Sequence, residues 1–192
     1  MPREFVISDL HFGHGLMISE KIRSPRPYDD TTQMNNALVE AWNAAVEPED
    51  TVYVLGDVVL GMAPNAGIAQ LSRLLGRKVL VRGNHDDDEI VTAPGLWDEV
   101  HSYLELLRTK NRPMVVLFHF PIEEWHGIRR DAVHLHGHQH GRNRPMKNRL
   151  DVGVDAVGLA PIRLEDAIKL AQKQKTVMTA LDVHSPRSKR PK

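Results

Sequence analysis

Short apolar runs alternate with helical patterns along the first half of the chain. Three of these runs are rich in β-branched and aliphatic residues, as buried strands are, and they cover residues 5–7, 51–55 and 78–82. Over residues 31–46, apolar side chains recur every three or four positions, which predicts an amphipathic helix with Trp42 in the core. A second helical pattern covers residues 64–75 and ends at Gly76. This alternation predicts an α/β fold.

The second half of the chain is predicted to contain more strands than helices. We expect strands over residues 100–107, 114–118, 132–136 and 151–155. Residues 162–173 have the apolar spacing of a closing helix, and residues 15–30 contain two prolines and are expected to form a loop. From residue 176 onward the chain is rich in Pro, Ser and basic residues and is interpreted as a tail of low order.

Length and charge narrow the class of protein. The 192 residues suit one substantial core, so we expect a single domain over residues 1–175 and a tail over residues 176–192. The 25 basic and 25 acidic residues cancel, which gives no overall attraction to nucleic acid or to an anionic membrane. No apolar run approaches the roughly 20 residues of a membrane span, and no signal-peptide pattern opens the chain. A cytoplasmic protein without a membrane partner is therefore expected.

Three histidines are concentrated in one short segment, Leu135-His136-Gly137-His138-Gln139-His140-Gly141. Two histidines separated by one residue project to the same side of an extended segment, and glycine lets the backbone approach a bound ion. A polar loop, or a set of hydrogen-bonded core histidines, would produce the same pattern. Since the chain has no cysteine, any metal ligands must be His, Asp, Asn or Glu.

Polar side chains with the chemistry of metal ligands follow five of the predicted strands. They are Asp9 with His11, Asp57, Asn84 with His85, His119, and His138 with His140. In α/β folds, sites form where the carboxyl ends of the strands meet, and this mixture of nitrogen and oxygen donors suits a divalent transition metal. Asp9 taken alone would equally well cap the turn that follows it. The repetition at five strand ends favours a metal site.

In order and type, these residues resemble the sequence blocks of the calcineurin-like metallophosphoesterases. The blocks are Asp-x-His at 9–11, Gly-Asp at 56–57, Gly-Asn-His-Asp at 83–86, a lone His at 119 and Gly-His-x-His at 137–140. The opening Ser-Asp-x-His-Phe-Gly-His is most similar to the small bacterial and phage-type branch of that superfamily. The resemblance implies its sandwich architecture, an α/β (α+β) fold of two packed mixed β-sheets flanked by helices.

The resemblance also implies two divalent metal ions. One would be held by Asp9, His11 and His140, the other by Asn84, His119 and His138, and Asp57 would bridge them. Two cations about 3.5 to 4 Å apart can bind one phosphoryl group, and a hydroxide bridging them is available as nucleophile near neutral pH. Nitrogen and oxygen ligands favour Mn, Fe, Zn, Ni or Co without choosing among them.

Two further residues are candidates for a catalytic role. By resemblance, His85 is the histidine that does not bind metal and instead protonates the leaving oxygen as a general acid. A histidine suits this task because its ordinary pKa lies close to physiological pH. Asp86 would either orient His85 or cap its loop, and His14 would either contact the substrate or lie behind the ligands. His134 and His136 are expected to be packed or hydrogen-bonded.

These features predict a metal-dependent phosphoesterase that cleaves a phosphodiester or phosphomonoester of a small or nucleotide-like substrate. Gly56-Asp57 lacks the Asp-Arg-Gly continuation of the protein phosphatases, which argues against a phosphoprotein substrate. A nuclease acting on RNA or DNA ends is the alternative, and a non-catalytic scaffold is disfavoured because every block is filled. The basic residues that follow the histidine segment would bind substrate phosphates or form a solvated surface: Arg142, Arg144, Lys147 and Arg149. The sequence predicts no oligomeric state.

Overall fold

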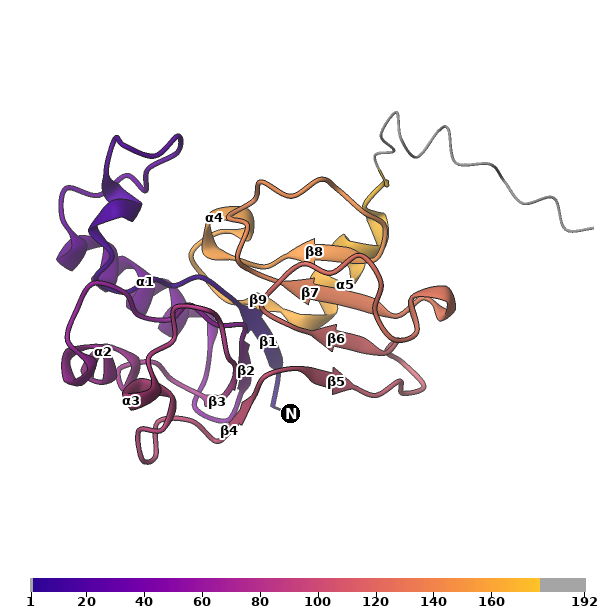
Figure 1. Ribbon diagram of the computed structural model, residues 1–192. Helices are drawn as coiled ribbons and strands as arrows, with labels where there is room; N and C mark the ends of the chain where they lie inside the picture. The colour runs from indigo at the N-terminus through magenta and orange to yellow at the C-terminus, as the bar shows by residue number, and fades with distance from the viewer. Residues whose placement is uncertain (1, 177–192) are drawn as a thin grey trace, which may run out of the picture.

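The computed structural model describes residues 2–176, which form two mixed β-sheets with flanking helices (Figure 1). The first sheet has the order β4-β3-β2-β1-β9, and all its strands are parallel except β9. Its strands are β1 (Glu4–Ile7), β2 (Thr51–Val54), β3 (Arg77–Val81), β4 (Glu99–His101) and β9 (Ile162–Arg163). The predicted two-sheet architecture is therefore confirmed.

The second sheet has the order β5-β6-β7-β8, and only β5 runs antiparallel to its neighbour. Its strands are β5 (Leu104–Leu106), β6 (Val115–Leu117), β7 (Val133–His136) and β8 (Arg149–Asp151). The helices are η1 (Gly15–Ile18), α1 (Thr31–Ala45), α2 (Pro64–Leu71), α3 (Asp88–Val91), η2 (Ile128–Arg130), α4 (Val154–Val157) and α5 (Leu164–Lys173). Among the described residues, none of these helices is long and apolar enough to cross a membrane.

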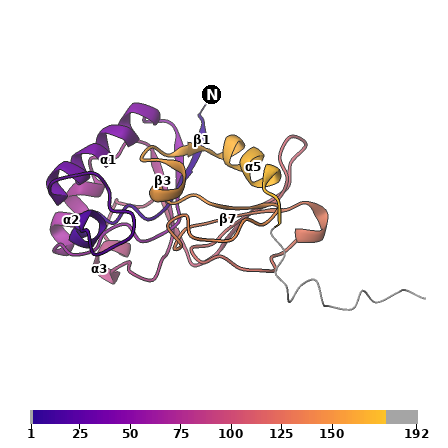
Figure 2. The same ribbon diagram turned by 90° about the horizontal axis from the view of Figure 1, so that it is seen from above.

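The strands β1, β2 and β3 of the first sheet are buried on both faces. On β1, Phe5 and Ile7 pack against α1 and its neighbours, whereas Val6 packs in a second cluster with residues of the other sheet. Strands covered on both sides are nearly continuous in apolar residues, which is why these runs are recognisable in the sequence. Helix α5 contacts β1, β7, β8 and β9 and closes the second cluster (Figure 2). Trp42 is fully buried, as predicted.

Two predicted strands differ from the structure. The apolar stretch 100–107 is divided between two sheets, because β4 pairs with β3 whereas β5 pairs with β6. Residues 151–155 are not a strand: β8 ends at Asp151, whose Oδ1 accepts a hydrogen bond from the backbone N of Gly153 (2.9 Å). Helix α4 begins immediately afterwards, and Asp155 lies in its first turn, where the helix dipole favours a negative charge.

The remaining predicted elements are placed correctly, with shifts at their ends. The helix expected over 64–75 ends at Leu71, and the one expected over 162–173 begins at Leu164 after the two residues of β9. Within the loop expected over 15–30, residues 15–18 form the short helix η1. The tail expected from residue 176 lies, apart from its first residue, outside the described residues.

Candidate metal centre

The candidate ligands lie where the carboxyl ends of strands from both sheets meet. The loop after β1 runs alongside the loop after β2, since Asp9 N donates to Gly56 O (3.1 Å) and His11 N donates to Asp57 O (3.0 Å). From the second sheet, Gly137 N donates to His119 O (3.0 Å), which holds the loops after β6 and β7 together. The topology thus brings residues more than 120 positions apart to one edge.

Six of the predicted ligands form two compact groups. Within each group, the potential ligand atoms all lie within 4.8 Å of one another. The first group is Asp9, His11 and His140, and the second is Asp57, His119 and His138. Asn84, the remaining predicted ligand, lies beside the second group, with its Oδ1 3.0 Å from His119 Nε2. The structure therefore brings all seven residues together at one edge.

Asp57 belongs to the second group and also faces the first. Its Oδ2 is 3.7 Å from Nε2 of His11 in the first group and 3.5 Å from Nε2 of His119 in the second. Two ligands bound at about 2.1 Å to one cation are separated by roughly 3 to 3.5 Å, so these spacings approach those of a coordination shell. A single carboxylate oxygen facing one ring of each group is the geometry that a bridging ligand requires.

The surroundings of His11 fit a metal. Both ring nitrogens are buried and neither has a hydrogen-bond partner among residues 2–176, although a buried polar atom normally has one. Burial lowers the pKa of His11 to about 2, so the ring is neutral and its contacts with Asp9 and Asp57 are not ion pairs. A neutral imidazole facing two carboxylates, with no other partner, has the protonation state and position of a metal ligand.

Asp9 is also buried at a cost that a cation would offset. Burial raises the pKa of its carboxyl group to about 6, because the charged form loses its hydration. Both of its oxygens accept a hydrogen bond from the backbone N of His138, at 3.1 and 3.0 Å. This contact fixes the carboxylate relative to the histidine segment, so the donors of the two groups are held in place by one another.

The backbone is strained at the candidate ligands. Among residues 2–176, seven residues other than glycine have a positive φ, and five of them are Asp9, His11, Asp57, His138 and His140. The left-handed conformation costs roughly 1 kcal/mol or more for such a residue, and it persists where the surrounding structure enforces it. Glycine would relieve this strain but has no ligand atom. The concentration of strain at these five positions indicates a functional requirement for their side chains.

The Gly-Asn-His-Asp loop after β3 contributes the other predicted residues. His85 is exposed, its ring centroid lies 6.0 Å from that of His11, and its backbone N donates to Asp57 Oδ1 (2.9 Å). Asp86 is buried, and its carboxylate accepts hydrogen bonds from Val58 N (2.9 Å) and Gly83 N (2.7 Å). Asp86 therefore ties this loop to the one after β2.

Two residues near the centre were not predicted from the sequence as supports of the ligands. Arg26 is 5% exposed, and its guanidinium donates to the carbonyl oxygens of Asp9 and Leu10 and to the carboxylate of Asp155. Asp155 also contacts Nδ1 of His140 at 2.7 Å. The sequence held only a weak signal for this pair, because Arg26 lies in a predicted loop and Asp155 in a segment predicted to be a strand.

The sequence of the chain matches the model of one protein family. The model of the calcineurin-like phosphoesterase family matches residues 3–152, which include every residue of the two groups. The chain belongs to this family. Its members usually bind divalent metals, and both candidate groups lie within the matched region.

Individual relatives agree with the family assignment. An uncharacterised protein of Methanocaldococcus jannaschii is 29% identical over 191 residues, which cover 95% of this chain and 99% of the relative. The Gene 66 protein of Mycobacterium phage D29 is 30% identical, with 81% of this chain and 89% of the phage protein covered. These archaeal and phage relatives fit the small branch of the family. A crystal structure of a protein of unknown function from Aquifex aeolicus shares the fold, with a TM-score of 0.67, 22% identity and coverage of 88% of this phosphoesterase and 100% of that chain.

Four other histidines of the phosphoesterase lie outside the two ligand groups. His134 and His136 are buried and make hydrogen bonds to backbone carbonyl oxygens, as predicted. His126 is exposed and pairs with Glu105 at 3.0 Å. The ring of His14 lies 5.4 Å from that of His11, and His14 is not a member of the first group, so it lies beside that group. Its Nδ1 is buried and has no hydrogen-bond partner in the described part of the chain.

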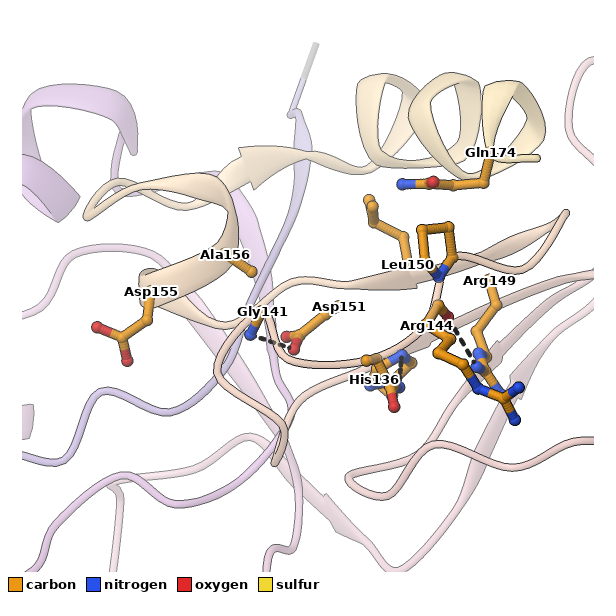
Figure 3. Close-up of a pocket in the computed structure, with 11 residues that line it drawn as sticks. His136, Gly141, Arg144, Arg149, Leu150, Asp151, Asp155, Ala156 and Gln174 are labelled. Atoms are coloured by element: carbon orange, nitrogen blue, oxygen red, sulfur yellow. Dashed lines mark hydrogen bonds between the residues drawn. The ribbon is translucent and has the colours of Figure 1, made fainter. Parts of the chain in front are cut away.

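A cavity of about 300 Å³ lies behind the histidine segment of the phosphoesterase (Figure 3). Its lining includes Arg144, Arg149, Asp151 and Asp155, and none of the seven candidate ligands lines it. Arg149 donates to the carbonyl oxygens of Ile122 (3.1 Å) and Arg144 (3.2 Å). Of the basic residues predicted as possible phosphate contacts, Arg144 and Arg149 thus line a neighbouring cavity, and Arg149 is bonded to backbone there.

Proposed function

We propose that this phosphoesterase hydrolyses a phosphomonoester or phosphodiester at a dinuclear metal centre, with His85 as general acid. One cation would be held by Asp9, His11 and His140, the second by Asn84, His119 and His138, and both by Asp57. The observation that carries the proposal is the position of Asp57 Oδ2, which lies 3.7 Å from His11 Nε2 and 3.5 Å from His119 Nε2.

Two cations in these groups would supply Lewis-acid stabilisation of the phosphoryl oxygens and would lower the pKa of water. The residues of the chain hold the ligand atoms in position for this chemistry. His11 is neutral because burial lowers its pKa, and Asp9 is held by the backbone N of His138. Donors fixed in this way need little reorganisation when a phosphate ester binds, which is the basis of electrostatic preorganisation.

His85 has the exposure and the support that a general acid requires. Its side chain is exposed beside the first group, while its backbone N is held by Asp57 and its loop is braced by Asp86. As the bond between phosphorus and the leaving oxygen breaks, the proton of His85 would pass to that oxygen, so the product leaves as a neutral alcohol. Proton transfer of this kind contributes about 10²- to 10⁴-fold to the rate.

The proposed substrate is a small or nucleotide-like phosphate ester. Zero net charge gives no general attraction to nucleic acid, which favours a small or nucleotide-like ester over a nuclease substrate. The scaffold alternative predicts that ligands or the histidine of the Gly-Asn-His block have been lost. Every one of these positions is filled, and the side chains converge, so we retain hydrolysis as the proposed function.

The test is a hydrolysis assay of the metal-free protein after loading with Mn, Fe, Zn, Ni or Co. The substrates are p-nitrophenyl phosphate, bis-p-nitrophenyl phosphate, and labelled single- and double-stranded RNA and DNA. We expect hydrolysis of at least one nitrophenyl ester with at least one metal. Cleavage confined to oligonucleotide ends would establish the nuclease alternative. A folded, metal-loaded protein that hydrolyses none of the substrates would contradict the proposal.

A further inference from the structure

Three aromatic side chains lie outside the hydrophobic core. The chain has four Phe, three Tyr and three Trp, all within the described residues, and seven of these ten belong to a core cluster or pack against one. The other three are Tyr103, Phe118 and Phe120. Exposed apolar side chains scattered singly need no explanation, whereas a contiguous group of large ones indicates a binding surface.

These three rings form a continuous strip that begins at the metal centre. The ring centroid of Phe120 lies 4.7 Å from that of His138 and 4.9 Å from that of His119, so it contacts two candidate ligands of the second group. Phe118 follows at 5.6 Å from Phe120, and Tyr103 at 6.0 Å from Phe118. We call these three residues the aromatic strip.

The aromatic strip is exposed at both ends and held in position. Phe120 is 36% exposed and Tyr103 is 40% exposed, although His119, next to Phe120, is fully buried. The hydroxyl of Tyr103 donates to Glu105 Oε1 (2.8 Å), and Glu105 also pairs with His126. Ordered rings that remain open to solvent lose little conformational entropy when a flat ligand packs on them.

We propose that the aromatic strip is a subsite for a flat ring in the ester group of the substrate, such as a nucleobase or an aryl group. This inference rests on the proposed function, because the phosphoryl group at the metal centre brings the ring to the strip. Aromatic rings pair at centroid separations of about 4.5 to 7 Å, and a base stacks on an aromatic side chain whatever its identity. The subsite would therefore select for a ring without reading its hydrogen-bonding edge.

The test compares two ligands that cannot be hydrolysed, phenylphosphonate and methylphosphonate, by calorimetric titration of the Mn-loaded protein. We expect phenylphosphonate to bind about 5- to 150-fold more tightly than methylphosphonate, since this is the range that stacking on one aromatic side chain contributes. In Phe120→Leu this preference should fall to about twofold, whereas Phe120→Trp should restore it. Rescue by a second aromatic residue separates stacking from a purely structural effect of the substitution.

Leu170→Ala is the matched control, because Leu170 is 42% exposed on α5 and belongs to neither metal group. This variant should keep the wild-type preference. If the wild type binds both phosphonates equally, the ring subsite is refuted while the proposed function stands. If neither ligand binds, the phosphate site fails and the subsite with it. Loss of a dimer in Phe120→Leu, without any ring preference in the wild type, would assign the strip to a contact between two copies of the chain.

Discussion

Nδ1 of His140 lies 2.7 Å from Oδ2 of Asp155, so the opposite nitrogen of the ring, Nε2, faces Asp9 Oδ1 at 3.8 Å. Asp155 is fixed in turn by two hydrogen bonds from Arg26, at 2.8 and 2.9 Å. Burial alone would raise the pKa of Asp155, but the hydrogen bonds from His140 and Arg26 outweigh it and hold the pKa well below its usual range. Asp155 is therefore a carboxylate that fixes the orientation of a candidate ligand.

Replacing this carboxylate should weaken metal binding. We expect Asp155→Asn to lower the affinity for Mn²⁺ by about 10- to 100-fold, which is the usual effect of losing such a partner of a ligating histidine. The measurement is competition of the protein with a fluorescent chelator for Mn²⁺. Asp166→Asn on α5 is the control, because the Asp166 side chain is about half exposed and, among the described residues, pairs only with Lys169. Equal affinities for wild type and Asp155→Asn would show that Asp155 does not position His140.

The two groups predict a specific stoichiometry of bound metal. His140→Ala removes a ligand from the first group alone and His119→Ala from the second alone, so each should reduce the content from about two ions per chain to about one. Asp57→Asn should reduce the metal occupancy of both groups, since Asp57 Oδ2 faces a histidine of each. Elemental analysis after gel filtration measures the content. A wild-type protein that saturates with one ion would refute the dinuclear arrangement.

His85 should matter for turnover and not for metal content. We expect His85→Ala to lower kcat by about 10²- to 10⁴-fold, the usual contribution of a general acid, with the metal content close to that of the wild type. The loss should be smaller for p-nitrophenyl phosphate than for an alkyl ester, because nitrophenolate leaves without needing a proton. His101→Ala is the control, since His101 lies on β4, belongs to neither metal group and pairs with Glu99. Loss of metal together with activity would make His85 a ligand.

The elements that carry the site could be predicted because their physical signals are local. Strands such as β1 and β2 are buried on both faces, so each appears in the sequence as an apolar run that ends abruptly in a carboxylate. The positions of Asp9 and Asp57 followed from this pattern, and the resemblance added the pairing of ligands.

Other parts of the site depend on contacts between distant residues. Asp155 was predicted to lie in a strand, and nothing near it in the sequence shows that its carboxylate meets Arg26, 129 positions away. The division of residues 100–107 between two sheets is a property of the pairing partners, β3 and β6, and not of the stretch itself. The aromatic strip was missed for the same reason, since Tyr103 and Phe118 become neighbours only through the pairing of β5 with β6.

Gly137 should not tolerate a side chain. A Cβ at this position would collide with Ser8 Oγ and with Asp9 Oδ2, and Ser8 is itself held by a hydrogen bond to Leu55 O (2.7 Å). We expect Gly137→Ala to displace the carboxylate of Asp9, lower the metal content and cost about 1 to 3 kcal/mol of stability through overpacking. Gly15→Ala is the control, because no atom of the described residues lies within 4 Å of the position that its Cβ would take. Normal metal content in Gly137→Ala would show that Asp9 is not held in this position.

An ion pair remote from the centre should make stability depend on pH. The carboxylate of Asp50 is buried and accepts hydrogen bonds from Arg3 N (2.7 Å), Arg3 Nε (3.0 Å) and Glu47 N (2.9 Å). The hydrogen bond from the Arg3 side chain is the main reason that the pKa of Asp50 lies far below its usual range. Because the unfolded-state pKa is higher, at about 3.9, this stabilisation is complete above about pH 5 and is lost as the pH falls toward the folded-state pKa.

Asp50→Asn should therefore be destabilised by about 2 kcal/mol at pH 7, the scale of a hydrogen bond to a charged group. Its stability should also decline less steeply than that of the wild type between about pH 5 and pH 2, since the variant has no carboxylate at this position to protonate. Urea unfolding of the metal-free proteins at several pH values measures both effects without interference from the metal centre. Asp29→Asn, in an exposed loop, should follow the wild-type curve. A pH dependence of Asp50→Asn as steep as that of the wild type would mean that other carboxylates, such as those bonded to Arg77 and Arg112, account for the loss of stability in acid.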